Sequence, residues 1–173
     1  FGSTPSSTDF NRTTRFTDRS SLNNAITAWI EDEAAATATY GDINYWDVSQ
    51  ITDFSELFKD KTTFNSDISN WDVSAGTDFR GMFNGATLFD QNIGSWNVGS
   101  GTDFGSMFSG ADAFNQDIGN WNVGSGNDFE GMFANAEAFN QDIGSWNVSS
   151  GNDFYKMFYE ADSFEQNIGN WQV

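Results

Sequence analysis

The sequence predicts an α/β solenoid of about five 25-residue repeats, each with a short parallel strand, a turn and a short helix. The first observation is tryptophan, which returns every 25 residues from Trp46 to Trp171 without an insertion. The second is phenylalanine, since every Phe beyond position 50 falls in one of three columns with the same period. A fixed period of this length, with the large apolar residues locked to it, is typical of stacked repeats. We therefore divide the 173 residues into an arm (1–20), a capping helix (21–41) and the repeats (42–173).

The arm is rich in Ser, Thr, Asp and Asn, and this composition predicts an extended segment. Phe1, Phe10 and Phe16 are its apolar points, so they are candidates for contact with a partner or with the rest of the molecule. Asn11 begins an Asn-Arg-Thr sequon and is a candidate for N-glycosylation.

The capping segment carries an apolar stripe at helical spacing. Its members recur at i, i+3, i+4, i+7 and i+8: Leu22, Ala25, Ile26, Trp29 and Ile30. Ser20 or Ser21 is expected to cap the start of this helix, and Gly41 to mark its end. A terminal repeat needs such a cover because its stacking face is otherwise exposed.

Each repeat combines two apolar periods. The Trp-x-Val triplet has the alternation of a strand, so its Trp and Val are expected to point inward. The apolar residues that follow have the spacing of about two helical turns, in the second repeat Phe79, Met82, Phe83 and Ala86. An Asp precedes each predicted helix and is expected to cap it: Asp53, Asp78, Asp103, Asp128 and Asp153.

The composition excludes several classes of function. The formal net charge of −18 disfavours nucleic acid and anionic membrane surfaces, both of which are bound through Lys and Arg. The chain has no Cys and no His, which removes thiol chemistry, the usual nucleophile–base pairs and nearly every zinc site. We therefore expect a protein that is not an enzyme and needs no cofactor. Proteins or copies of the same chain are its expected partners, and polysaccharide is a further candidate.

The repeats resemble those of the BspA-like leucine-rich-repeat surface proteins. The motifs that carry the resemblance are Gly-Met-Phe-Asn-Gly-Ala at 81–86, Phe-Asp-Gln-Asn-Ile at 89–93 and Phe-Asn-Gln-Asp-Ile-Gly-Ser-Trp at 139–146. The match covers 42–173, although this chain has Phe after the turn where the family often has Met or Val. The resemblance implies a leucine-rich-repeat-like solenoid, an extracellular or cell-surface location and a role in adhesion or protein binding. It implies no catalytic residue.

Two polar columns have alternative interpretations. The Asp column has helix capping as its simpler role, but Asp103 and Asp128 end Gly-Ser-Gly-x-Asp runs that echo calcium-binding β-rolls, so they are also calcium candidates. The residue between Trp and Val forms an outward polar stripe, which suits either solvent or an extended polysaccharide. Its members are Asp47, Asp72, Asn97, Asn122, Asn147 and Gln172. Acidic pairs are too abundant for any one of them to indicate glycoside hydrolysis.

The last repeat supplies the remaining candidate contacts. Tyr155, Lys156 and Tyr159 interrupt outer positions at which Gly and Ser recur in the other repeats, and they are candidate anchors for a partner, with a solvated surface as the alternative. Trp171 and Val173 form a final rung whose edge is open to another strand.

We expect a protein of adhesion or protein–protein interaction. The first alternative is a self-assembling subunit of an extracellular filament or surface layer, joined head to tail through the arm and the last repeat. The second is a calcium-dependent binding module. Asn147 begins an Asn-Val-Ser sequon and is a second glycosylation candidate.

Overall fold

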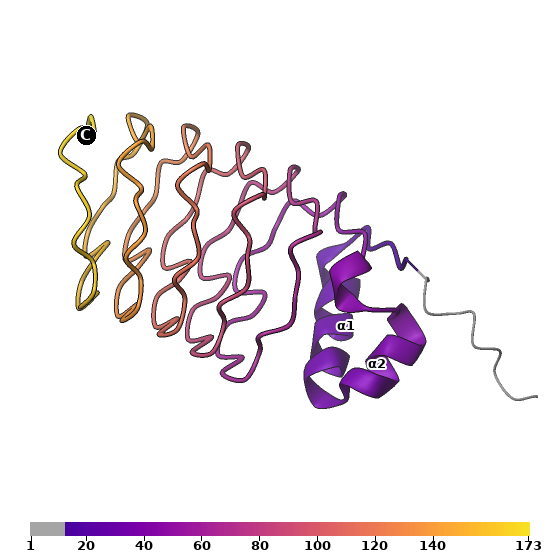
Figure 1. Ribbon diagram of the computed structural model, residues 1–173. Coiled ribbons are helices and arrows are strands. Elements are labelled where there is room, and N and C mark those ends of the chain that lie inside the picture. The colour runs from indigo at the N-terminus through magenta and orange to yellow at the C-terminus, as the bar shows by residue number, and fades with distance from the viewer. Residues whose placement is uncertain (1–12) are drawn as a thin grey trace, which may run out of the picture.

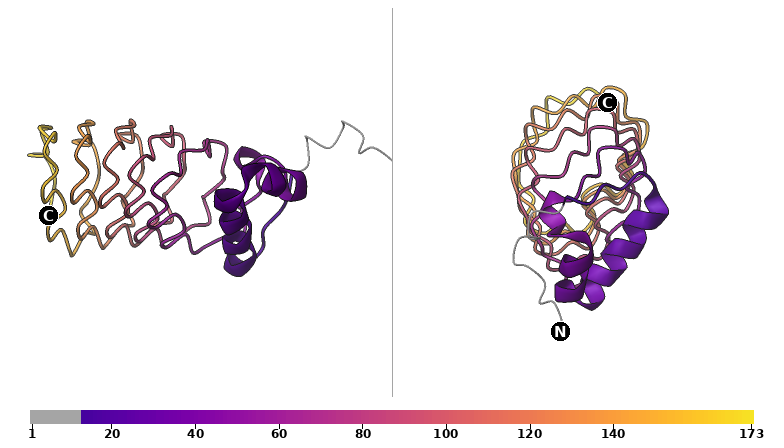
Figure 2. Two further views of the ribbon diagram at one scale, coloured as in Figure 1. Left: turned by 90° about the horizontal axis from the view of Figure 1, so that it is seen from below. Right: turned by 90° about the vertical axis from the view of Figure 1, so that its right-hand side faces the viewer.

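The computed structural model describes residues 13–173 and shows two helices at one end of a stack of irregular coils (Figure 1). The helices are α1 (Arg19–Glu31) and α2 (Glu33–Tyr40), followed by a short 3-10 helix η2 (Ile43–Tyr45). The rest of the chain winds in coils of 25 residues, which share nearly the same outline when viewed along the stack (Figure 2). We number them coil 1 to coil 5: 46–70, 71–95, 96–120, 121–145 and 146–170.

The predicted α/β architecture, a leucine-rich-repeat-like solenoid with a parallel strand and a short helix in each repeat, is wrong. Within residues 13–173 the coils contain no α-helix, and backbone bridges occur only as isolated parallel pairs. Between coils these bridges join the Asp column (Asp53, Asp78, Asp103, Asp128 and Asp153) and not the Trp-x-Val triplets, of which only the first takes part in a bridge, through Asp47. The triplets are tied along the stack by their indole rings instead. The indole N–H of Trp96, at the start of coil 3, donates to the carbonyl oxygen of Ile68, 28 residues earlier near the end of coil 1, at 3.2 Å.

The segment predicted as a helix is a series of tight turns. In coil 3, Ser106 and Gly110 have φ values of 53° and 66°, in the left-handed region, and the corresponding two residues of every other coil also have positive φ. The N–H of Met107 donates to the carbonyl oxygen of Phe104, three residues back, whereas the N–H of Phe108 donates to Met132 in the next coil at 2.9 Å. An α-helix needs negative φ and i→i−4 bonds throughout. Left-handed residues four places apart prevent both, although they preserve the inward spacing that suggested a helix.

Columns of stacked aromatic rings form the core. Phe83 lies between Phe58 and Phe108, with ring centroids 5.4 and 5.6 Å apart, and its plane is inclined to theirs by 3° and 7°. Within its own coil it stacks on Phe89 at 3.9 Å. All of these rings are fully buried. Offset parallel rings combine burial of apolar surface with a favourable aromatic geometry, so each coil is stabilised mainly by the coils on either side.

Two helices, rather than the single one expected over 21–41, cover coil 1. Asp32 separates them with an extended backbone (φ −155°, ψ 93°), and its carboxylate caps α2 by accepting the N–H of Ala35 at 3.0 Å. Asp18, not Ser20 or Ser21, caps α1. The inner face of α1 includes Trp29, whose ring meets Trp46 of coil 1 edge-on with centroids 5.8 Å apart. Within residues 13–173, neither helix has the length and hydrophobicity needed to cross a membrane.

The segment before α1 also lies against coil 1. Arg15 forms a parallel bridge with Asp47, and the N–H of Phe16 donates to the carbonyl oxygen of Asp47 at 2.9 Å. The ring of Phe16 is buried, with its centroid 5.1 Å from that of Trp46. This short rung and the two helices together close the first end of the aromatic core.

Candidate functional site

One lateral side of the stack, which we call the Asp face, presents the same five-residue segment of every coil, from 52–56 in coil 1 to 152–156 in coil 5. Each Asp of this face accepts the backbone N–H of the residue two places later at 2.8–2.9 Å. The expected helix-capping role is therefore wrong, because the carboxylates close Asx turns and no helix follows them. The parallel bridges hold these carboxylates in register along the stack.

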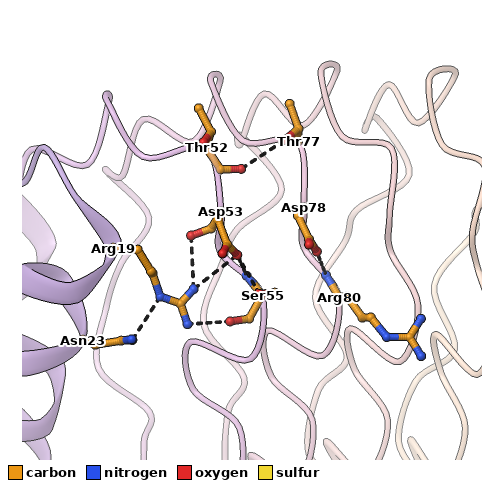
Figure 3. A network of polar contacts seen from close by, with 8 residues as sticks. All are labelled: Arg19, Asn23, Thr52, Asp53, Ser55, Thr77, Asp78 and Arg80. Carbon is orange, nitrogen blue, oxygen red and sulfur yellow. Dashed lines mark hydrogen bonds and ion pairs between the residues drawn. The ribbon is translucent and has the colours of Figure 1, made fainter.

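Arg19 latches α1 to the first segment of the Asp face (Figure 3). Its guanidinium lies 3.4 Å from the carboxylate of Asp53 and also donates to the backbone carbonyls of Asp53 and Ser55. Burial raises the pKa of Asp53, but hydrogen bonds from Ser55 and the nearby Arg19 outweigh it, so the pKa lies below its ordinary value. Asp53 therefore stays ionised to a lower pH than an ordinary Asp carboxyl, and its ion pair with Arg19 persists to that pH.

Arg80 is the cation at the middle of the Asp face. It reaches along the stack, with its guanidinium 3.2 Å from Asp128, 3.6 Å from Glu130 and 3.9 Å from Asp103. Burial raises the pKa of Asp103, and the charges of Asp128 and Asp78 raise it further, against the hydrogen bond from Gly105 and the charge of Arg80. The face therefore carries more negative charge than its arginines neutralise.

The calcium candidates Asp103 and Asp128 are brought to neighbouring coils, but they flank a guanidinium. Oδ1 of Asp103 is occupied by the N–H of Gly105, and Oδ2 of Asp128 faces Arg80. Across residues 13–173, no three or more acidic side chains converge as a metal site requires. The geometry here favours ion pairing over cation coordination.

Tyr155, Lys156 and Tyr159 form an exposed cluster at the coil 5 end of the Asp face, which we call the tyrosine cluster. Tyr155 is 61% exposed and Tyr159 47% exposed. The ammonium of Lys156 lies 5.2 Å from the ring centroid of Tyr155 and 4.9 Å from that of Tyr159, so it holds the rings through cation–π contacts. The hydrogen bond and charge of Glu160 raise the pKa of Tyr159.

The candidate contact residues of the arm and of the last rung differ in their exposure to solvent. Phe16 is buried under the cap, whereas Phe1, Phe10 and the sequon residue Asn11 lie outside the described residues. Trp171 stacks on Trp146 with ring centroids 6.3 Å apart, and Val173 is 88% exposed.

The outward polar stripe forms a second row of Asx turns. The side-chain oxygen of Asp72 accepts the N–H of Ser74 at 3.0 Å, and that of Asn122 accepts the N–H of Gly124 at 3.1 Å. Asn147 is exposed, and its side-chain oxygen binds both the N–H and the hydroxyl of Ser149. The stripe thus shapes the corner of each coil as well as facing solvent.

A polar ladder on the return segment of the coils was missed from the sequence. The side-chain oxygen of Asn115 accepts the N–H of Asn140 in the next coil at 2.9 Å, and the amide of Gln141 donates to both oxygens of Asn115. The recurring Phe-Asn-Gln-Asp run was the available signal. These bonds add a second, polar reason for the coils to keep a constant register.

Residues 30–130 and 102–173 match a family described as "Mycoplasma protein of unknown function, DUF285". No match was found among curated proteins or among solved structures. The two matched segments overlap and together span the last two residues of α1, all of α2 and the whole coil stack. The chain therefore belongs to the DUF285 family.

Proposed function

We propose that this chain is a non-enzymatic, secreted or cell-surface binding protein that holds a basic protein partner at the tyrosine cluster. The observation that carries the proposal is the pair of exposed rings of Tyr155 and Tyr159, fixed by Lys156 on a rigid stack. The resemblance to surface proteins of adhesion supports the location and the role. No step of this function needs a catalytic group or a cofactor.

The tyrosine cluster has the properties of a binding anchor. Tyrosine offers a large contact area with little conformational entropy to lose, and it is enriched at the residues that dominate binding energy. The backbone beneath the rings is tied to coil 4, because the N–H of Gly131 donates to Tyr155 at 2.9 Å and that of Asn135 donates to Tyr159 at 2.7 Å. A partner therefore meets rings that are already positioned.

The negative charge around the tyrosine cluster determines which class of partner it attracts. Asp153 and Glu160 adjoin the tyrosines, and Asp128 and Glu130 occupy the preceding coil of the same face. A partner rich in Lys and Arg is attracted to such a rim, which raises its rate of association. The same face on a second copy is repelled, because each copy has a net charge of −18.

Surface plasmon resonance against a panel of basic and acidic extracellular proteins tests the proposal. We expect at least one basic protein to bind the immobilised chain, with an affinity that falls as ionic strength rises. The double substitution Y155A/Y159A is expected to weaken binding by at least tenfold, since two anchors are lost. Y45A is the matched control, because Tyr45 is 57% exposed but lies in η2, on the corner that carries the outward polar stripe.

Two results would overturn the proposal. One is a panel in which the partners that bind are acidic. The other is a basic partner whose affinity is unchanged by Y155A/Y159A or is reduced equally by Y45A. Melting temperatures of the two variants and of the unsubstituted chain show whether any loss of binding comes from unfolding.

A further inference from the structure

A cleft of about 440 Å³ lies between α1 and coil 1, at the opposite end of the stack from the tyrosine cluster. Ile26 of α1 and Leu57 of coil 1 lie at its base but are only 1% and 3% exposed, so the accessible lining is mainly polar. Polar side chains from both elements form the walls. In a concave site, a few convergent polar groups orient a small ligand and provide specificity.

Arg19 arranges one wall of this cleft (Figure 3). Its Nε–H donates to the side-chain oxygen of Asn23 at 3.0 Å, while its other nitrogens hold Asp53 and Ser55. This bond fixes which way the Asn23 amide faces, so its NH₂ group is presented as a donor. Within residues 13–173 that NH₂ group makes no hydrogen bond, and Thr27 adds a hydroxyl one helical turn further on.

The opposite wall carries one uncompensated positive charge. Lys59 and Lys61 both line the cleft, but the ammonium of Lys59 lies 2.7 Å from Glu56 and is paired. The ammonium of Lys61 has no ion pair among residues 13–173. Because the chain has only 7 basic side chains against 25 acidic ones, an ammonium without an ion pair distinguishes this cleft by its positive charge.

We propose that this cleft binds a sugar that carries one carboxylate, of the uronic acid class. The single carboxylate pairs with Lys61, while the sugar hydroxyls meet the side chains of Asn23 and Thr27. A single charge fits better than several, because Lys61 is the one ammonium of this cleft without an ion pair among residues 13–173, and the overall charge of −18 repels each further negative charge. The site is independent of the tyrosine cluster and extends the function proposed above to a second ligand.

Titration with D-glucuronate, followed by ¹H–¹⁵N NMR at low ionic strength, tests this site in the full chain. We expect saturable shifts at the amides of residues 23–27 and 55–61 and none at the tyrosine cluster. D-glucose is the matched probe, since it has the same ring without the carboxylate, and its binding is expected to be at least tenfold weaker. Inorganic phosphate tests whether any anion suffices, and it is expected to bind more weakly than glucuronate.

Three variants complete the experiment. K61Q removes the free ammonium and is expected to weaken glucuronate binding at least tenfold. N23D keeps an oxygen for Arg19 but replaces the NH₂ donor by a negative charge, so it is expected to abolish binding. R15Q removes an exposed cation that does not line the cleft and is expected to leave the affinity unchanged. Absence of saturation, equal binding of glucose, tighter binding of phosphate or an unaffected K61Q would each overturn the proposal.

Discussion

Phe108 stacks on Phe133 of the next coil, with ring centroids 5.6 Å apart and the two planes inclined by only 8°. The same ring stacks on Phe83 of the preceding coil and on Phe114 within its own coil. Because few backbone bonds cross between coils outside the Asp face and the turns, these ring contacts are a principal link along the stack. A ring in the middle of a column should therefore matter more than one at its end.

Phe108→Ala is expected to lower the free energy of unfolding by about 3–5 kcal/mol, through lost burial and the cavity left behind. Phe158→Ala, at the same position in coil 5, is expected to cost clearly less, since Phe158 is only partly buried and has one fewer neighbouring coil. Urea unfolding followed by tryptophan fluorescence measures both. Equal losses would show that the ring column does not link the coils.

Ser106→Gly is expected to stabilise the protein by up to about 1 kcal/mol, because Ser106 has a φ of 53°, where a side chain is strained. Ser109→Gly, in the same segment but without a positive φ, is expected to destabilise it by about 0.5–1 kcal/mol. Were this segment a helix, both substitutions would destabilise. Thermal unfolding of the two variants therefore separates a chain of turns from a helix.

Arg19→Lys is expected to lower the free energy of unfolding by about 1–2 kcal/mol, because an ammonium cannot bridge the oxygens of Asp53 and Ser55 as the guanidinium does. Arg15→Lys is the control, since Arg15 is 59% exposed and lies 3.5 Å from Asp47, and a change below about 0.5 kcal/mol is expected. Hydrogen exchange in α1 measures the loosening of the cap. Equally faster exchange in both variants would contradict the role of Arg19 in holding α1 against coil 1.

Asp103→Asn is expected to stabilise the protein at neutral pH by less than about 1 kcal/mol, as is usual for a partly exposed charge. The pKa of Asp103 is raised in the folded state, first by burial and then by Asp128 and Asp78, so ionisation costs more in the folded than in the unfolded chain. Stability is therefore present below the unfolded pKa and is lost as the pH rises through the folded pKa. The gain from Asp103→Asn should vanish in acid, and a gain that persists at pH 3 would contradict this origin.

The inward columns of the coils could be predicted from the sequence, because a ring that returns at a constant interval is buried only if the coils stack. Phe79, Phe83 and Phe89 are all fully buried, in agreement with their spacing. The secondary structure could not be predicted by that argument, since two left-handed residues per coil keep the i, i+3, i+4 spacing without a helix. Gly81 and Gly85 were the available sign of left-handed backbone, but Glu56 and Lys156 occupy the Gly81 position in coils 1 and 5, and Asp60 and Glu160 the Gly85 position, so the sign is not repeated in every coil.

The surface was less predictable than the core. Tyr155 and Tyr159 stand out in the sequence because the other coils have small or charged residues at their positions, and both are exposed. The cleft was not predictable, since it depends on how α1 lies across coil 1. Arg19 and Lys61 are 42 positions apart, and no repeat period relates them.

Long-range NOEs between ring protons of residues 25 positions apart, in a Phe-labelled sample, test most directly whether the rings stack in columns along the coils. Stacked columns predict cross-peaks that connect Phe58 to Phe83, Phe83 to Phe108, and Phe108 to Phe133 in an unbroken series. Absence of these peaks, together with consecutive helical NOEs across residues 79–86, would contradict this stacking.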